Sequence, residues 1–433
     1  MSLLSRRDFL KTSACAAAAV GTTGMLANRV DAADLWPIPE VDVKITRAMK
    51  IEVEYDRPRI VAGNSQYRLA GGVRREPILV VFGDNGKIGV GACNWGAGQG
   101  DVEYAIGKTV TQLLQDHGAV NGKICTSSFW DLAGKTLDQP VYQLLGGKEN
   151  PDGVPVYDGS IYHEELLPRD RGTAYRNAGA SYADRASWQD AIKEAIDHTL
   201  WLGHTFAKVK IGRGALHLSR LAGNYQDVAV LELIRQHAGA DFGIGVDANN
   251  GYRMEDVFWL LREHGDLNLA FIEEMIPDNV DNYRQIQQVI REQKLKTLVA
   301  DGEGWRNSYD PLAAEIIESG TVDILQGDMR AFHLEGIRRE SNMALEAGHA
   351  ARIAPHNWGN EFGFLMQIHV ACAIPNFYRA EQDPGTLRGE LLVRKSAYDI
   401  AGGRCHNYSA PGLGMELNAK QLDSAKVIHE ARV

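Results

Sequence analysis

Eight short apolar runs, separated by helical stretches, constrain the fold of most of this 433-residue chain. Successive runs mostly begin about 25 to 35 residues apart, and alternating strands and helices of this kind indicate a parallel sheet. Eight such units are typical of a TIM-like (β/α)8 barrel, so we expect an α/β fold with a barrel domain over residues 151–400. The runs are residues 154–157, 206–211, 242–246, 270–272, 297–300, 322–325, 351–354 and 377–380.

Residues 40–150 have a different pattern. From residue 43 to residue 90, polar and apolar side chains alternate, and the turn sequence Asp84-Asn85-Gly86 separates two apolar runs, which predicts antiparallel strands joined by a hairpin. Helical periodicity follows and ends at Gly146 and Gly147. We therefore expect an α+β capping domain over residues 40–150, with the turn-rich segment 401–433 packing on it.

The first 32 residues resemble an export signal. Arg6 and Arg7 precede a small, apolar, alanine-rich run over residues 12–26, a pattern typical of a Tat signal peptide. The run is too short for a stable membrane span, and the alternative is a cytosolic amphipathic N-terminus. We expect a mature protein with no membrane segment, periplasmic or otherwise exported through Tat. Normal export of a chain in which both arginines are lysine would contradict this.

Charge and cysteine content exclude several classes of partner. The formal net charge is −10, and no clustered basic segment appears, which argues against a nucleic-acid partner. Outside the expected signal peptide, Cys93, Cys125, Cys372 and Cys405 are widely spaced, which argues against a zinc site or a dense disulfide framework. We expect a small-molecule carboxylate substrate, attracted by local charge, and a homo-oligomer.

Acidic side chains follow three successive apolar runs. In a barrel the C-terminal ends of all strands surround one mouth, so Asp247, Glu273 and Glu303 should converge there. Any one of them alone would more often be a helix cap or a solvated loop residue. Together they supply the hard oxygen ligands that Mg²⁺ prefers. Since neighbouring residues on a strand point in opposite directions, only one of Glu273 and Glu274 should face the metal, and the alternation does not decide which.

Candidate acid and base groups follow the other runs. Lys208 and Lys210 lie two apart and should both face the barrel interior, where burial, a second cation and a divalent metal are expected to lower the lysine pKa. Asp328 and His356 follow neighbouring runs, so a carboxylate should orient the imidazole. Glu381 follows the last run. Surface lysines and a structural histidine are the alternatives.

Two further segments identify a family resemblance. Residues 129–135, FWDLAGK, and 139–147, QPVYQLLGG, are similar to the capping-domain helix and its exit in the mandelate racemase and muconate lactonising enzyme group of the enolase superfamily. The resemblance spans most of residues 43–415 and implies an enolase-type barrel, Mg²⁺, and chemistry at the carbon alpha to a carboxylate through an enediolate. Sites of this superfamily combine a Lys or His base with Mg²⁺ that stabilises the enediolate.

The resemblance also implies roles for individual residues. It makes Lys210 one base and Lys208 the group that neutralises the substrate carboxylate, and it favours Glu273 over Glu274 as a ligand. The implied metal ligands are Asp247, Glu273 and Glu303. The Asp328 and His356 pair matches the mandelate racemase-like subgroup. Glu381 matches an acidic residue that assists the substrate carboxylate. The sequence departs from the group at Gly327, where proline is common, and in a long segment over residues 162–187, which we interpret as a loop over the barrel mouth.

A polar pocket favours a polyhydroxylated substrate. The side chains expected to line it are Asn249, Asn250, Arg330, Asn357 and Asn360. Dehydration of a sugar acid, an aldonate or an aldarate, is the favoured reaction. The alternatives are a racemase or epimerase of 2-hydroxy acids, and an exported sugar-acid binding protein without catalysis.

Overall fold

The computed structural model describes residues 36–118, 126–167, 187–358, 361–383, 398–417, 422–423 and 425–433. The expected signal peptide, Cys125, Asn360 and most of the segment 162–187 lie outside the described residues. Within them, no helix is long and apolar enough to cross a membrane.

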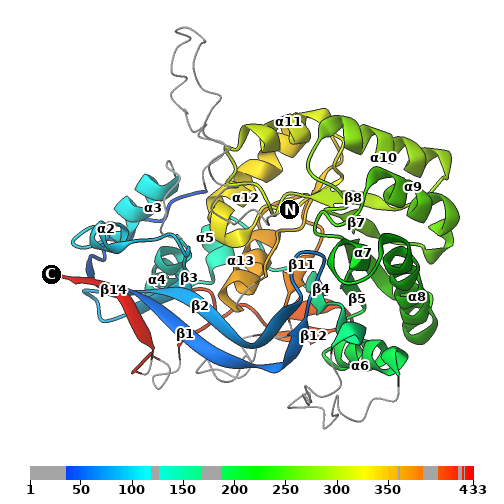
Figure 1. Cartoon of the computed structure of the whole chain (residues 1–433). Coiled ribbons are helices and arrows are strands. Elements are labelled where there is room, and N and C mark those ends of the chain that lie inside the picture. The colour runs from blue at the N-terminus through cyan, green and yellow to red at the C-terminus, as the bar shows by residue number, and fades with distance from the viewer. Residues whose placement is uncertain are drawn as a thin grey trace, which may run out of the picture. The chain divides into compact units, whose positions relative to one another are not determined.

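A four-stranded antiparallel sheet forms the capping region. Its strands are β1 Ile45–Ala62, β2 Leu69–Gly83, β3 Ile88–Ala92 and β14 Lys426–Arg432, in the order β14-β1-β2-β3. The hairpin between β2 and β3 lies where the sequence predicts it, with Gly86 at φ +77°. Figure 1 shows the C-terminal strand β14 beside β1, which it joins in antiparallel register. The sequence pattern did not predict β14, because its side chains are only partly buried.

Among the described residues between β3 and the barrel, four helices follow: α2 Gln99–Glu103, α3 Val110–Gly118, α4 Ser127–Leu137 and α5 Val141–Leu144. The predicted helical stretch is therefore interrupted, and Asp138, at φ +55°, ends α4. Gly91 lies under α4, where a Cβ atom would come within 2.3 Å of the Ser127 hydroxyl, so a glycine permits close packing of α4 on β3.

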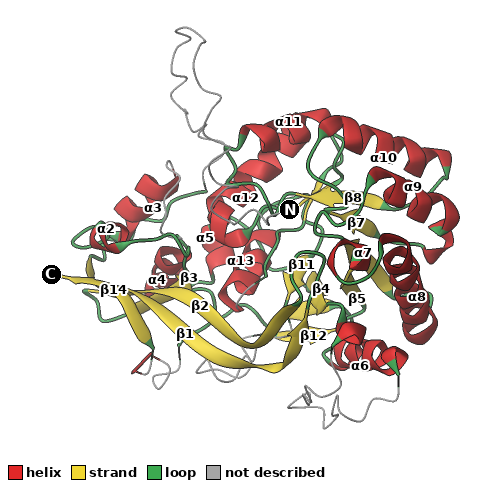
Figure 2. Ribbon diagram, in the orientation of Figure 1, coloured by secondary structure: helices red, strands yellow, loops and turns green. Residues whose placement is uncertain are grey.

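Eight parallel strands, counted among the described residues, form the barrel (Figure 2). The order β10-β9-β8-β7-β6-β5-β4 continues to β11, which pairs with β4, and a bridge between Ile353 and Phe377 links β10 to the segment before β11. The strands are β4 Val154–Ile161, β5 Phe206–Lys210, β6 Gly243–Asp247, β7 Phe271–Glu273, β8 Leu298–Asp301, β9 Ile324–Leu325, β10 Arg352–Ile353 and β11 Ala380–Gln382. Each overlaps one of the eight predicted runs, so the predicted α/β barrel with an antiparallel capping sheet is confirmed.

Helices connect the barrel strands along the chain. They are α6 Trp188–Trp201, α7 Arg213–Leu216, α8 Arg220–Ala238, α9 Met254–Glu263, α10 Val280–Glu292, α11 Pro311–Ser319, α12 Met329–Glu346 and α13 Glu361–Ala371. Short 3-10 turns lie at Glu164–Leu166 and Gly265–Leu267. Beyond β11, the short strands β12 Asp399–Ala401 and β13 Arg404–His406 pair with each other, and β13 pairs with β4.

Aromatic rings fill the barrel below its mouth. Tyr157, Phe206 and Phe271 are buried with ring centroids 5.7 to 6.0 Å apart. Two glycines on β6 leave room for these rings. A Cβ atom on Gly243 would lie 2.1 Å from the Phe206 ring, and one on Gly245 would lie 2.3 Å from the Phe271 ring. Because side chains alternate along a strand, the same inward faces that carry these rings carry polar groups further along the strands.

Close packing favours glycine over proline at position 327. A Cβ atom there would lie 2.5 Å from the Phe332 ring. The Gly327 N–H also weakly favours the charged form of Glu340, a buried residue of α12 whose carboxylate oxygens have no hydrogen-bond partner in the described part of the chain. Burial, only partly offset by that N–H, raises the pKa of the Glu340 carboxyl to about 8. A proline would supply no N–H.

Glu340 should make stability depend on pH. Its pKa rises from an ordinary 4.5 to about 8 on folding, so the folded state keeps a proton that the unfolded state releases between these values. Stability from this group is present below pH 4.5 and is lost as the pH rises through 8. Glu340→Gln, neutral throughout, should therefore raise the free energy of unfolding at pH 9 by about 1–3 kcal/mol relative to the parent, and change it less at pH 4.

Urea unfolding at the two pH values measures this difference. Glu346→Gln, an exposed position on the same helix, is the control and should leave the pH dependence unchanged. Parallel pH profiles for the parent and Glu340→Gln would show that Glu340 does not carry the predicted proton.

Candidate metal centre and active site

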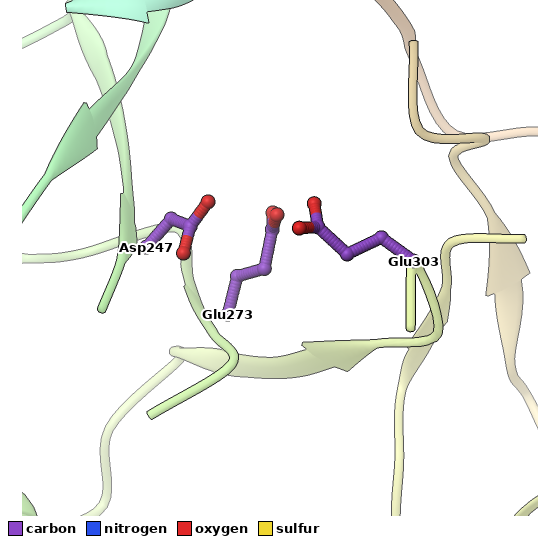
Figure 3. A group of neighbouring side chains, drawn as sticks. All are labelled: Asp247, Glu273 and Glu303. Atoms are coloured by element: carbon purple, nitrogen blue, oxygen red, sulfur yellow. The ribbon is translucent and has the colours of Figure 1, made fainter. Parts of the chain in front are cut away.

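Three carboxylates meet at the barrel mouth (Figure 3). Asp247 ends β6, Glu273 ends β7, and Glu303 follows β8 by two residues. One oxygen from each lies within 4.8 Å of the other two, and Figure 3 shows Glu273 between its partners. Asp247 and Glu273 are buried and Glu303 is half-buried. We call these residues the acidic triad; the structure thus brings together the predicted metal ligands.

Glu274 does not join the triad. Its backbone has φ +42°, so it turns away from the strand direction. Its carboxyl accepts a hydrogen bond from the Asn249 amide at 3.0 Å. Burial, followed by repulsion from Glu303 and Asp247, raises the pKa of Glu274 to about 10. Strand alternation did not decide between Glu273 and Glu274. In the structure, Glu273 is the residue that lies with Asp247 and Glu303.

Both predicted lysines of β5 point into the mouth and are buried. The Lys208 ammonium lies 2.6 Å from Glu273 Oε1, 2.9 Å from Glu381 Oε1 and 3.5 Å from Asp247 Oδ2. The Lys210 ammonium pairs with Asp247. Lys208 thus contacts both Asp247 and Glu273, and Lys210 contacts Asp247.

The protein groups around the two lysines raise their pKa values, and the predicted lowering, which also counted a divalent metal, stays a prediction. Burial, the largest single effect, and repulsion from Lys208 lower the pKa of Lys210, but the combined attraction of Asp247, Glu303 and Glu273 outweighs them, so the pKa is raised. Lys208 behaves in the same way, with Glu273 and Glu381 as the attracting carboxylates. The prediction weighed the neighbouring cations and underweighted the carboxylates that surround them.

The triad carries more negative charge than its lysines balance. Burial and the neighbouring carboxylates, opposed by Lys208, raise the pKa of Glu273 to about 8. The pKa of Asp247 is about 2, because Lys210 and Lys208 outweigh its burial. Glu303 Oε2 is buried, and its contact with His356 Nε2 at 3.2 Å is an ion pair without hydrogen-bond geometry. Converging hard oxygen donors with surplus negative charge fit a divalent cation such as Mg²⁺.

His356 lies at the other end of the triad and is held by Asp328. Its Nδ1 is 2.8 Å from Asp328 Oδ2, and its Nε2 is 3.2 Å from Glu303 Oε2. Although burial lowers it, Glu303 and the Asp328 hydrogen bond raise the pKa of His356 to about 9, so the imidazole is charged at neutral pH. Asp328 is fixed in turn as the N-cap of α12, where it accepts from the Arg330 and Ala331 N–H groups.

Lys210 and His356 therefore flank the same three carboxylates. Lys210 contacts Asp247, His356 contacts Glu303, and Glu273 lies between those two residues. The arrangement places one proton-transferring group at each end of a cation site. Such a pair can act on two faces of a molecule bound at the triad.

Glu381, on β11, completes the ring of acidic groups. One carboxylate oxygen contacts Lys208, and the other accepts the Asn357 backbone N–H at 2.8 Å. The neighbouring strand β4 carries Gly159, where a Cβ atom would lie 2.3 Å from Glu381 Oε1. A glycine at that position leaves space for the carboxylate.

The remaining predicted side chains contact protein groups. The Asn249 amide bonds to Glu274, to Glu303 at 3.5 Å and to Asn64 of the capping region at 2.6 Å, so it braces the triad. Arg330 pairs with Glu76, and the amide of Asn357 reaches the Glu381 carbonyl. Direct contact of Asn249, Arg330 or Asn357 with a substrate stays a prediction.

Sequence reasoning missed Gln326. Its amide donates to Glu273 Oε2 at 2.6 Å and so fixes the oxygen that Lys208 does not hold. Gln326 is two residues beyond the inward-facing Ile324 of β9. Strand alternation alone could have identified it, whereas Asn64 gave no signal because it approaches from another region of the chain.

Comparisons with known proteins agree with this geometry. Residues 190–421 match the family described as Enolase C-terminal domain-like. The chain is 26% identical to D-xylonate dehydratase of Haloferax volcanii over 81% of this chain and 85% of the relative. It is 25% identical to D-galactarolactone cycloisomerase of Agrobacterium fabrum over 81% and 91%. A mandelate racemase/muconate lactonizing protein from Geobacillus sp. Y412MC10, crystallised with magnesium and tartrate, superposes with a TM-score of 0.75 at 24% identity, covering 91% of this chain and 98% of that one.

Removing one triad carboxylate should weaken cation binding. Glu303→Gln is expected to lower the affinity for Mg²⁺ by at least about tenfold, because it takes away charge and a hard oxygen donor. The fold should persist, since Glu303 is half-buried at the mouth and not in the apolar core. Isothermal titration calorimetry with Mg²⁺ measures the loss, with Glu315→Gln on α11 as a control away from the triad. Equal affinity of the parent and Glu303→Gln would remove Glu303 from the ligand set.

Proposed function

Because the chain belongs to the mandelate racemase and muconate lactonising enzyme group of the enolase superfamily, we propose that it is a Mg²⁺-dependent sugar-acid dehydratase. The observation that carries the proposal is the placement of Lys210 and His356 at opposite ends of one acidic triad. The resemblance to D-xylonate dehydratase over most of both chains supports the same reaction class.

The residues of the triad would hold the metal. Asp247, Glu273 and Glu303 have the donor type and spacing for it, and Mg²⁺ bound there supplies positive charge that stabilises an enediolate. Lys208 adds a fixed ammonium beside Glu273, placed to pair with a substrate carboxylate. Gln326 keeps Glu273 oriented from the other side.

Proton transfer is divided between Lys210 and His356. In its neutral form, Lys210 removes the proton alpha to the carboxylate, and the electron pair of that C–H bond enters the enediolate. His356, charged at neutral pH because its pKa is about 9, donates its proton to the departing β-hydroxyl as the C–O bond breaks. The products are water and an enol that becomes a 2-keto-3-deoxy acid. Asp328 orients the imidazole through Nδ1 and stabilises its charged form until the proton is donated.

A racemase or epimerase is the second candidate. The same opposed placement would let one group remove the alpha proton and the other return it from the opposite face. The Asp328 carboxylate at His356 Nδ1 stabilises the charged imidazole and so supports the acid role needed for dehydration. A non-catalytic binding protein would not need Lys210, His356 and Asp328 arranged as a complete acid–base set.

Export through Tat remains part of the proposal, tested by replacing Arg6 and Arg7 together with lysine.

A panel of aldonates and aldarates tests the reaction. With Mg²⁺, at least one acid should yield a 2-keto-3-deoxy acid, detected as a ketone, and chelation should abolish the activity until Mg²⁺ is restored. Lys210→Ala and His356→Asn should each reduce turnover by at least about 100-fold, the usual scale for one acid or base group. A product that keeps all its oxygen while the alpha centre inverts would replace the dehydratase with the racemase. Full activity without metal would contradict both.

A further inference from the structure

A basic cavity of about 460 Å³ lies beside the mouth. Its walls include four arginines, together with Trp95 and Trp358. The arginines are Arg57, Arg74 and Arg75 of β1 and β2, and Arg330 of α12. We call this cavity the arginine pocket. It combines side chains from the capping sheet and from the barrel.

The pocket holds more positive than negative charge among the described residues. The Arg57, Arg74 and Arg330 side chains are 2%, 9% and 17% exposed. Two carboxylates face these cations: Glu76 contacts both Arg74 and Arg330, and Asp383 lies 3.4 Å from Arg57. Arg75 forms a separate, exposed pair with Glu54 at the rim. Among the described residues that these contacts join, three buried or half-buried guanidinium groups face two carboxylates.

Arg57 also has hydrogen-bonding capacity that no described residue uses. Its Nε is buried and has no hydrogen-bond partner in the described part of the chain. A buried guanidinium with an unused donor is unfavourable unless an acceptor is supplied. Carboxylate and phosphate oxygens match guanidinium donors in geometry as well as in charge.

The pocket adjoins the catalytic residues through Trp358. The Trp358 carbonyl accepts from Arg74 at 2.5 Å and from Arg330 at 3.0 Å, and its ring lies 4.4 Å from the Arg74 guanidinium carbon. Trp358 follows His356 by two residues, and Arg330 follows Asp328 by two. The same strand ends that place the acid–base pair therefore place the wall of the pocket.

An aromatic wall joins the pocket to Lys210. The Tyr67 ring stacks on Trp358 with centroids 6.3 Å apart. The Tyr67 and Tyr162 hydroxyl groups share a hydrogen bond, and Lys210 Nζ lies 5.5 Å from the centroid of the Tyr162 ring. A chain of aromatic contacts thus links Lys210 to Trp358, whose ring lies against Arg74.

We propose that the arginine pocket binds a second anionic group at the far end of the substrate, so that the preferred sugar acid has two anionic groups. We call any such acid a dianion, although a phosphate ester brings its total charge to about −3. The second group is a carboxylate, as in an aldarate, or a phosphate ester. One carboxylate is held at the triad and Lys208, and the distal anion is held by Arg57, Arg74 and Arg330. This inference rests on the proposed function for the identity of the ligand as a sugar acid, and on the charge and geometry of the pocket for the second anion.

Binding of matched acids to the full chain with Mg²⁺ tests the proposal. The probes are aldarates against the aldonates of the same configuration, and 6-phosphogluconate against gluconate, measured by isothermal titration calorimetry. The tightest ligand should be a dianion, bound roughly 10- to 100-fold more tightly than its monoanionic match, which is the range expected for a charged hydrogen-bonded contact. Preference within the aldarate pairs identifies a carboxylate, and preference for 6-phosphogluconate identifies a phosphate ester.

Arg330→Gln should remove most of this preference. It leaves Arg74 to pair with Glu76, and it should weaken the dianion alone, without weakening the monoanion. Arg47→Gln is the matched control, because Arg47 is an arginine of the same sheet that pairs with Glu430 away from the pocket. Equal binding within every pair, equal weakening of both members by Arg330→Gln, or no binding of any dianion would overturn the proposal. These binding results are independent of ketone formation. Ketone formation without a preference for dianions would contradict only the pocket proposal, and a preference for dianions without ketone formation would contradict only the dehydratase proposal.

Discussion

The ion pairs that join Lys208 and Lys210 to Asp247 and Glu273 are the interactions on which the barrel mouth depends. Buried ions are costly unless each is paired, and here the lysines of one strand neutralise part of an acidic cluster formed by the next strands. The compensation is incomplete, since the pKa of Glu273 stays raised to about 8. A divalent cation at the triad would complete it, and would reduce the attraction that keeps Lys210 protonated. In the proposed mechanism, metal binding and base function would thus be two consequences of one charge balance.

Much of the site could be predicted because strand periodicity is simple. On β5, Phe206, Lys208 and Lys210 share the inward face, with an aromatic ring below two ammonium groups. The eight apolar runs located the strands, and the acidic residues at their ends located the mouth. The same reasoning could not choose between Glu273 and Glu274, because that choice depends on a backbone turn with φ +42° at Glu274.

The other differences arise from contacts that are distant in sequence. Asn64 reaches Asn249 across 185 residues, and β14 pairs with β1 across nearly the whole chain. Neither leaves a local pattern. The direction of the lysine pKa shifts also depends on how many carboxylates converge, which is a property of three-dimensional packing. The arginine pocket was missed for the same reason: only Arg330 was singled out, while Arg57 and Arg74 belong to the capping sheet.

The central claim is that Lys210 and His356 act on opposite faces of one alpha carbon. Exchange of the alpha proton in deuterium oxide, followed by NMR with a bound sugar acid, tests it most directly. We expect exchange that requires Mg²⁺, persists in at most one of Lys210→Ala and His356→Asn for an acid of given configuration, and is absent when both are replaced. Exchange at the parent rate in the double variant, or without metal, would contradict it.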